Sequence, residues 1–343
     1  MRIVHAVYSD RRGGLEQAFV NTTRMLLLLD HDVELWVPKK APYLDELEES
    51  CLRVDLTSHG YFDLLAMLRH YRRLRTTVPD LIITHNSRAS TLLARAATGL
   101  TVPHLAFSHG YKTHRFNKVD HLVALTEDMR QHFISAGHPP ECVSVFPNVI
   151  EQVPDLNPRA NLVDDEPIRL GFVGRLNEEK GLEDLLRAVA LLKNRCLLEL
   201  HIAGSGPDQM MIEALAQHLG IASTLNFSGW VDDIQSWMKT VDLIIVPSRS
   251  ESFGIVVLEA AAYGCPTIAT EVSGPASQIN PGVDGWLAKP ASPEGLACVI
   301  EQVVLAQDTW HAVRQAAYLR AKRYQMDARL NELDAIIRGV TAK

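Results

Sequence analysis

The chain has 343 residues, of which 47% are hydrophobic and 22% are charged, a composition typical of a globular protein with more than one domain. Its formal net charge of −7 gives no sign of nucleic-acid binding, and no apolar run reaches the length of about 18 residues that spans a membrane. The five cysteines are scattered without a C-x-x-C pair, which excludes the usual disulfide and zinc spacings.

The first half alternates short apolar runs with longer helical patterns. Strands are predicted at Ile3–Tyr8, Val33–Val37, Leu81–Thr84, His104–Ser108 and Leu122–Leu125, and a helix at Gly14–Leu29. Such alternation is typical of parallel sheets built from right-handed crossover units. The opening strand is no signal peptide, so we expect a cytoplasmic protein.

A proline-rich, acidic stretch from Pro147 to Pro167 predicts a linker. After it, strands are predicted at Arg169–Val173, Leu197–Ala203, Thr224–Ser228, Leu243–Pro247 and Thr267–Ala269, and helices at Leu182–Lys193 and Gln209–His218. We therefore predict two doubly wound α/β domains, at residues 1–155 and 165–322, and a C-terminal helix at 323–343 that could cross back to the first domain. Because ligands of such sheets bind beyond the carboxyl ends of the strands, we expect one site in a cleft between the domains.

The loop from Ser9 to Glu16 follows the first predicted strand and opens a helix. Gly13 and Gly14 would let backbone N–H groups approach an anion there, and would equally allow a tight turn without a ligand. The dinucleotide fingerprint G-x-G-x-x-G is absent, which argues against NAD.

The loop "GRLNEEKG", from Gly174 to Gly181, follows the first strand of the second half. Gly174 permits the turn, and Arg175 and Lys180 are two cations that could converge on a diphosphate. The alternative is a solvated basic pair balanced by the two glutamates between them. Their position at a carboxyl-end glycine turn favours the diphosphate.

Two further loops have weaker patterns. In "IAGSGPD", Gly204 lies at a strand end and would allow a ligand to approach the backbone closely. In "SGWVDDI", the loop around Val231 could supply main-chain contacts to a nucleobase.

The stretch "SRSESFGIVVLEAAAYG" places a glutamate on either side of a predicted helix start. We expect the helix to begin near Phe253, so that the N–H groups of Ser252 to Gly254 point towards an anion. Glu251 would lie just outside and Glu259 one to two turns inside, where a buried carboxylate needs partners such as the hydroxyls of a ribose. Alternatively, Glu251 caps the helix and Glu259 lies on the surface.

These loops, in this order, resemble the second domain of the retaining glycosyltransferases of family 4, which have the GT-B fold. The most specific match is the pair Glu251 and Glu259, separated by seven residues. The loop Gly13–Glu16 and the "FSHG" run Phe107–Gly110 resemble the first domain less stringently. A Gly-Gly-x-x-Glu loop common in the family is Ser273-Gly274-Pro275-Ala276-Ser277-Gln278 here, without the glutamate.

The resemblance implies roles for these residues. Arg175 and Lys180 would bind the donor diphosphate, Glu251 would contact the hydroxyls of the sugar, and Glu259 would bind the ribose. His109 would lie near the anomeric carbon, on the acceptor side. The phosphate oxygens would accept hydrogen bonds from the amides of Ser252, Phe253, Gly254 and Ile255. The other substrate-binding positions would be Gly13, Gly14, Glu16, Gly174, Gly204 and Val231.

We therefore predict a retaining hexosyltransferase that moves a sugar from a nucleoside-diphosphate sugar, with a UDP-sugar the first candidate, to an acceptor hydroxyl. No D-x-D triplet occurs, so we expect neither a metal nor a cofactor besides this co-substrate. A GT-B sugar-nucleotide epimerase and a non-catalytic nucleotide-sugar-binding protein are the alternatives.

The acceptor is predicted to be a saccharide or lipid-linked saccharide of the cell envelope, such as a lipopolysaccharide core, reached at the cytoplasmic face of the inner membrane. Lys112, Arg115 and Lys118, which follow His109, could meet a phosphorylated acceptor. The amphipathic stretch Tyr61–Arg75 predicts either contact with anionic lipid or ordinary packing of a helix on its sheet. The packing alternative would use Leu64, Leu65, Leu68 and Tyr71.

Overall fold

The computed structural model describes residues 1–47, 51–57, 60, 63–156 and 166–342. The chain divides into two compact units, Met1–Glu151 with Met326–Lys343, and Gln152–Gln325. The predicted boundaries were 155, 165 and 322. Residues 157–165 of the predicted linker lie outside the described residues, as do Tyr61 and Phe62 at the start of the predicted amphipathic stretch.

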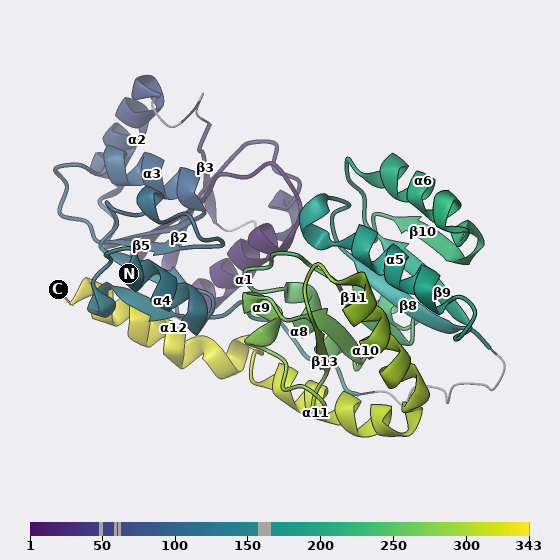
Figure 1. Ribbon diagram of the computed structural model, residues 1–343. Helices are drawn as coiled ribbons and strands as arrows, with labels where there is room; N and C mark the ends of the chain where they lie inside the picture. The colour runs from purple at the N-terminus through teal and green to yellow at the C-terminus, as the bar shows by residue number, and fades with distance from the viewer. Residues whose placement is uncertain (48–50, 58–59, 61–62, 157–165, 343) are drawn as a thin grey trace. The chain divides into compact units, whose positions relative to one another are not determined.

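In the described part of the first unit, parallel strands form one seven-stranded sheet in the order β3-β2-β1-β4-β5-β6-β7 (Figure 1). The strands are β1 (Arg2–Val7), β2 (Asp32–Val37), β3 (Leu52–Asp55), β4 (Leu81–His85), β5 (His104–Phe107), β6 (His121–Ala124) and β7 (Val143–Val145). The sequence analysis predicted five of them and missed β3 and β7. These two are the edge strands, and their four and three residues are too short to show a hydrophobic period.

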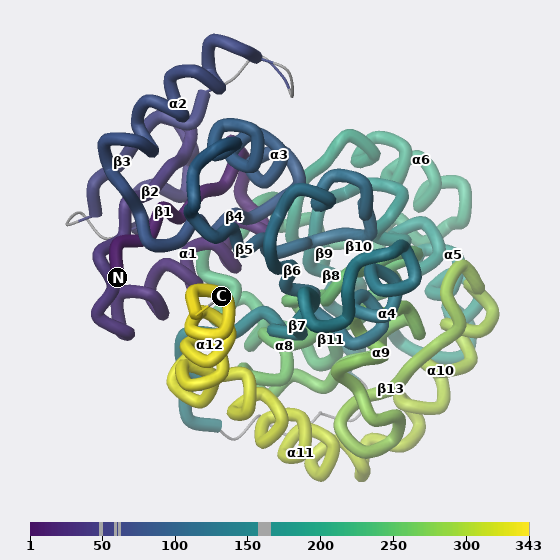
Figure 2. Tube along the Cα trace, turned by 90° about the vertical axis from the view of Figure 1, so that its left-hand side faces the viewer, coloured from purple at the N-terminus to yellow at the C-terminus, as the bar shows by residue number. Residues whose placement is uncertain are grey.

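Helices cover both faces of this sheet. They are α1 (Gly14–Leu28), α2 (Leu64–Thr77), α3 (Ser87–Ala96), α4 (Glu127–Ser135) and α12 (Met326–Thr341). The helix α12 comes from the far end of the chain and contacts α1 and β5 (Figure 2). Its Leu333 and Ile337 are fully buried in the same apolar cluster as Ile3 and Phe19, so the C-terminal helix completes the core of the first unit.

The helix α2 is not packed through the leucines that the packing alternative named. Leu64, Leu65 and Leu68 are 75%, 81% and 45% exposed, and the helix instead buries Ala66, His70, Leu74 and Thr77. The buried positions recur at intervals of three and four, as one face of a helix requires. The helix therefore packs on its sheet, as the packing alternative expected, but through Leu74 and the face opposite to the three leucines that were named for it.

In the described part of the second unit, six parallel strands form a sheet in the order β10-β9-β8-β11-β12-β13. The strands are β8 (Ile168–Val173), β9 (Leu198–Ala203), β10 (Leu225–Gly229), β11 (Leu243–Val246), β12 (Thr267–Thr270) and β13 (Trp286–Ala288). The helices are α5 (Leu182–Leu192), α6 (Gln209–Leu219), α7 (Ile234–Met238), α8 (Ile255–Ala262), α9 (Ser273–Ala276), α10 (Pro293–Leu305) and α11 (Trp310–Lys322). Two parallel sheets with helices between the strands confirm the predicted fold class.

Alternation along the strands of the second unit divides its core into two layers. Leu243 and Ile245 face the apolar cluster formed with α5 and α10, while Ile244 and Val246 face the cluster formed with α7 and α8. The loops at the carboxyl ends of these strands carry the predicted donor site. Among the described residues, no helix is both long and apolar enough to cross a membrane.

Candidate functional site

Glycines hold the carboxyl-end loops of the second unit against one another. A Cβ atom at Gly204, where φ is +136°, would lie 1.9 Å from the carbonyl oxygen of Gly174. A Cβ at Gly181 would lie 2.0 Å from the carbonyl oxygen of Pro247. The lack of a Cβ at Gly204 therefore lets two loops pack closely, and Gly181 does the same for the loop after β11.

Lys180 and Glu251 form an ion pair at this loop cluster. The Nζ atom of Lys180, two residues before the start of α5, donates a hydrogen bond to Oε2 of Glu251 in the loop after β11. Both side chains are partly buried, which strengthens the attraction relative to a surface pair. The structure thus brings together two of the residues predicted from the sequence. Arg175 is exposed, and within the described residues no hydrogen bond or ion pair joins it to either of them.

Arg249 is a site residue that the sequence analysis missed. Its Nε and Nη2 atoms each donate a 2.8 Å hydrogen bond to the carboxylate of Asp184 on α5. Its backbone N–H donates to the carbonyl of Glu179 at 2.8 Å. The Asp184 carboxylate raises the pKa of Arg249. This bidentate pair anchors the loop that carries Glu251 to α5. The sequence signal for the pair was Asp184, an acidic residue at a buried position of the helix, where a carboxylate needs a partner.

The helix α8 begins at Ile255, two residues later than predicted, with Gly254 before it at φ +79°. The free N–H groups of its first turn therefore include those of Ile255 and Val256. The side chain of Phe253 is buried. Gln278 donates from Nε2 to the carbonyl oxygens of both Phe253 and Gly254, so it fixes the turn that starts the helix.

Glu259 lies in the second turn of α8 and is half-buried, so it is not a solvated surface carboxylate. Loss of solvation raises its pKa to about 7. Burial, with smaller contributions from Glu259 and Asp233, raises the pKa of Tyr263 to about 12. The Glu259 carboxyl therefore lies close to Tyr263 and is poised between its charged and neutral forms.

The loop after β10 places Val231 against the apolar cluster of α7 and α8, half-buried. Its two aspartates have partners in the protein: Asp232 accepts from Trp230 Nε1 at 2.9 Å, and Asp233 accepts from the N–H of Ser236 at 2.9 Å. Across the described residues, no three His, Cys, Asp or Glu side chains cluster in a way that could hold a metal ion.

In the first unit, Glu16 is buried and accepts a hydrogen bond from the hydroxyl of Ser9, on the same loop. Tyr43 donates to the carbonyl of Ser9 at 3.0 Å, and burial, assisted by Glu16, raises its pKa. Gly13 is extended, and Gly14 is the first residue of α1. The side chain of Glu16, in the first turn of α1, therefore folds back onto the loop before the helix and holds the Gly13-Gly14 turn in place.

His109, after β5, pairs with a second histidine that the sequence analysis missed. Its Nε2 atom lies 3.0 Å from Nδ1 of His85, the last residue of β4. Burial lowers the pKa of His109 to about 4, so the ring is neutral near pH 7. His85 is fully buried and stacks on Phe107 with ring centroids 4.6 Å apart. A histidine that ends an apolar strand was the signal available in the sequence.

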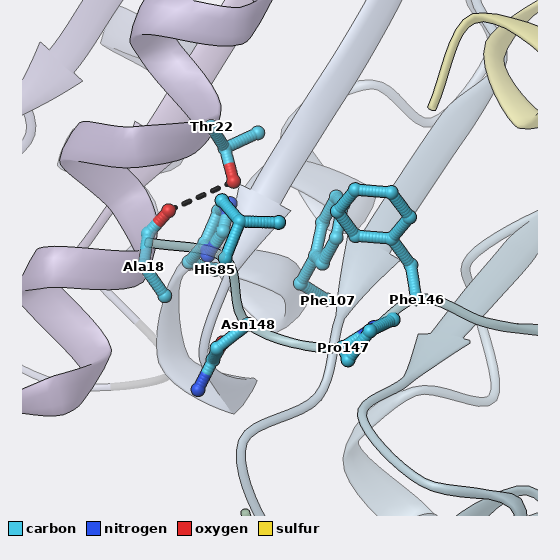
Figure 3. A pocket seen from close by; sticks show the side chains of 8 residues that line it. Ala18, Thr22, His85, Phe107, Phe146, Pro147 and Asn148 are labelled. Carbon is cyan, nitrogen blue, oxygen red and sulfur yellow. Dashed lines mark hydrogen bonds between the residues drawn. The ribbon is translucent and has the colours of Figure 1, made fainter. Parts of the chain in front are cut away.

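A small cavity of about 10 Å³ lies beside His85 (Figure 3). It has room for about one water molecule. Its lining comes from α1, from the strand ends and from the segment after β7: Ala18, Thr22, His85, Phe107, Phe146, Pro147, Asn148 and Val149. The hydroxyl of Thr22 donates to the carbonyl of Ala18 at 2.8 Å, which leaves only its lone pairs to face the cavity.

Comparison with known families matches most of the chain. Residues 155–320 match the family described as "Glycosyl transferases group 1", and residues 12–152 match "Glycosyltransferase Family 4". The match to residues 12–152 falls on the first unit, and the match to residues 155–320 falls on the second.

Among curated relatives, the chain is 27% identical to the lipopolysaccharide core biosynthesis glycosyltransferase LpsE of Rhizobium meliloti, over 70% of each chain. It is 26% identical to the lipopolysaccharide 1,6-galactosyltransferase of Salmonella typhimurium, over 67% of each. It is 38% identical to an uncharacterized glycosyltransferase of Methanocaldococcus jannaschii, MJ1607, but over only 36% of that relative.

Solved structures share the fold over nearly the whole chain. The apo form of the lipopolysaccharide outer core galactosyltransferase WaaB superposes with a TM-score of 0.81 and 21% identity, over 98% of this chain and 99% of that one. Anabaena HepE in complex with UDP-glucose superposes with a TM-score of 0.86 and 19% identity, over the same shares.

Proposed function

This chain belongs to the family 4 glycosyltransferases with the GT-B fold, and on that basis we propose that it transfers a sugar, with retention, from a UDP-sugar to a hydroxyl of a saccharide acceptor. The relatives that act in lipopolysaccharide synthesis support an acceptor in the lipopolysaccharide core or a related cell-envelope glycan. The complex of HepE with UDP-glucose supports a uridine donor.

The observation that carries the proposal is the ion pair of Lys180 and Glu251 beside the start of α8. Departure of a nucleoside diphosphate builds negative charge on its phosphates, and fixed positive groups lower the barrier most. Lys180, Arg175 and the first amides of α8 would supply that charge. With Lys180 turned to the phosphates, the carboxylate of Glu251 is free to accept hydrogen bonds from the hydroxyls of the sugar.

These contacts favour a reaction that needs no metal and no covalent sugar–enzyme intermediate. The two cations supply the charge that a divalent ion would otherwise provide. Glu251 is paired with Lys180 in the free protein and would turn to the sugar hydroxyls when Lys180 turns to the phosphates, which is a hydrogen-bonding role rather than nucleophilic attack. The leaving phosphate would then take the proton of the acceptor hydroxyl on the same face of the sugar, which retains the anomeric configuration.

A thermal-shift panel of UDP-, GDP-, ADP- and CDP-sugars tests the donor. We expect a UDP-sugar to raise the unfolding temperature and the others to change it little, because a ligand stabilises only the state that binds it. If no sugar nucleotide raises that temperature, the donor proposal is rejected. Incubating the bound donor alone separates the alternatives, since an epimerised sugar nucleotide would identify an epimerase.

The affinity for UDP-glucose is expected to rise with pH through about 7, because only the ionised form of Glu259 can accept hydrogen bonds from both ribose hydroxyls. With its pKa at about 7, Glu259 is mostly protonated at pH 6, so the Kd there should be about tenfold that at pH 8. The same raised pKa lowers the free energy of unfolding as the pH rises from about 4.5 to 7, since the folded state holds this proton more tightly.

Isothermal titration at several pH values measures this dependence. The Glu259→Gln variant is the control, because it keeps the shape of the side chain and cannot titrate. It should bind more weakly at every pH and show a flat profile. An equal pH dependence in both proteins would rule out Glu259 as the titrating group.

The exposed face of α2 supports contact with an anionic membrane at the cytoplasmic side. Leu64, Leu65 and Leu68 share this face with three exposed arginines, Arg69, Arg72 and Arg75, and the helix itself contains no acidic residue. Exposed leucines beside arginines are typical of helices that lie in the interface of anionic bilayers. Each arginine near such a surface contributes about 1 kcal/mol.

Vesicle flotation at low salt tests this contact. We expect the protein to float with phosphatidylglycerol-containing vesicles and the Leu65→Glu variant to partition about tenfold less, because a buried leucine contributes about 1.5–3 kcal/mol. Leu28→Glu is the matched control, since Leu28 is 57% exposed on another helix of the same unit. No flotation of the unmodified protein, or equal loss in both variants, would reject this surface.

A further inference from the structure

Three histidines of the first unit form a chain of contacts that ends at His109, in which the step from His5 to His85 is a ring contact and the step from His85 to His109 is a hydrogen bond. His5 on β1 and His85 on β4 are fully buried, and their rings meet edge to face with centroids 5.0 Å apart. His85 Nδ1 then lies 3.0 Å from His109 Nε2. A neutral imidazole has one N–H and one lone pair, so each link in such a chain constrains the next.

The direction of the hydrogen bonds is fixed at the inner end of the chain. The hydroxyl of Thr23 donates its one hydrogen to the carbonyl of Phe19, at 2.9 Å. It can therefore only accept from His5 Nδ1, which lies 3.0 Å away. Burial lowers the pKa of His5 to about 3, so the ring is neutral. The hydrogen of His5 is thus on Nδ1, and Nε2 carries the lone pair.

The groups around the next ring are acceptors as well. The Nε2 atoms of both His5 and His85 are buried and have no hydrogen-bond partner among the described residues. His5 Nε2 carries a lone pair. Thr22 lines the cavity beside His85, and because its hydroxyl donates to the carbonyl of Ala18, it can only accept a further hydrogen bond. An N–H at His85 Nε2 suits these surroundings, because it can donate, through one water in the cavity, towards the lone pair of either acceptor.

This arrangement sets the state of the outermost ring. With its hydrogen on Nε2, His85 has a lone pair at Nδ1 and must accept from His109 Nε2. We propose that Thr23, His5 and His85 are positioning residues that hold His109 with its hydrogen on Nε2, so that His109 Nδ1 is a hydrogen-bond acceptor for a sugar hydroxyl. The identity of that hydroxyl rests on the proposed function, whereas the position of the hydrogen is a property of the free protein.

Nitrogen-15 NMR of the free protein tests the proposal directly. Long-range proton–nitrogen spectra of protein labelled at its 14 histidines distinguish a ring with hydrogen on Nε2 from one with hydrogen on Nδ1. The signals missing from the His109→Gln spectrum identify His109. At pH 7.5 we expect one pattern for His109, with hydrogen on Nε2. Hydrogen on Nδ1, or an equal mixture, would overturn the proposal.

Two neighbouring threonines provide a matched pair of variants. Thr22 and Thr23 are both buried on α1 and both donate to the carbonyl four residues earlier, but only Thr23 accepts from an imidazole. Thr23→Val should leave His109 as a mixture of its two tautomers, although Thr23 does not touch it. Thr22→Val removes only one of the two acceptors near His85 Nε2 and should change the His109 spectrum less than Thr23→Val does. Equal spectra for the two variants would contradict the chain.

Substitutions at His85 separate this role from simple packing. The amide of Asn can take the place of Nδ1 and bond to His109, whereas Phe fills the space without a hydrogen bond. We expect His85→Asn to retain a single tautomer of His109 and at least a third of kcat/KM, and His85→Phe to lose both, with kcat/KM down about tenfold, the usual scale of one lost hydrogen bond. If His85→Phe retained the tautomer, His85 would be only a packing residue.

The failure of this proposal and that of the proposed function are distinguishable. If His109 has its hydrogen on Nε2 but no sugar nucleotide raises the unfolding temperature, the tautomer inference stands and the donor proposal falls. If a UDP-sugar binds but His109 has its hydrogen on Nδ1, the reverse holds.

Discussion

Replacement of Lys180 by alanine is expected to lower kcat by about 100- to 1,000-fold, because removing one preformed positive group from a developing anion costs that much in comparable sites. The variant also leaves the partly buried carboxylate of Glu251 without its partner. A smaller change in KM than in kcat is expected, since the charge on the diphosphate grows in the transition state. Steady-state kinetics with UDP-glucose or UDP-galactose and a saccharide acceptor measure both constants.

Lys193→Ala is the control for this experiment. Lys193 follows the last residue of α5, whereas Lys180 precedes its first, so the two lysines mark opposite ends of one helix. Lys193 is exposed and donates to the carbonyl of Leu219. We expect its variant to have kcat within about twofold of the unmodified protein, as for most surface changes. Wild-type turnover in Lys180→Ala would remove Lys180 from the donor site.

Gly181→Ala is expected to lower the free energy of unfolding by about 2–3 kcal/mol more than Gly220→Ala. The two glycines have almost the same backbone, with φ of +66° and +67°, so an added Cβ carries the same conformational cost of about 1–2 kcal/mol at either position. At Gly220 the nearest atom to that Cβ is the flexible end of Lys193, at 3.5 Å. At Gly181 the Cβ would lie 2.0 Å from the backbone of Pro247.

The second effect of Gly181→Ala is on activity. Gly181 directly follows Lys180, and Pro247 begins the loop that carries Glu251, so a shift of either backbone separates the ion pair. Urea unfolding gives the stability difference, and kcat measured well below the unfolding midpoint gives the effect on the site. Equal stability losses in the two variants would show that the loop after β11 moves aside without cost.

The fold was predictable where the hydrophobic pattern was long. The strand β11, for example, is a continuous apolar run from Leu243 to Val246, because both faces of a parallel sheet are covered. The three-residue strand β13 is too short for any period, and its place is set by pairing with β12. The orientation of α2 was not predictable, because leucines and arginines occupy one face and the core takes the small and polar side chains of the other, which reverses the usual amphipathic pattern.

The candidate site was predictable as a set of residue types, since the motifs carry them in sequence, but not as a set of contacts. The pairing of Lys180 with Glu251 joins residues 71 positions apart, and the pairing of His85 with His109 joins adjacent strands. Glycine patterns were the least specific signal. The lack of a Cβ allows either a ligand or a neighbouring loop to approach the backbone. At Gly204 the neighbour that the structure shows is the carbonyl of Gly174.

The placement of α12 has a consequence for folding during synthesis. Residues 152–325 form a unit complete in itself, whereas the first unit lacks part of its core until Leu333 and Ile337 have been made. The ribosome therefore releases most of the first unit before the second, but the core of the second unit can be completed before that of the first. Until then, the apolar groove on α1 and β5 that receives α12 stays uncovered, and it is a surface that a chaperone could shield.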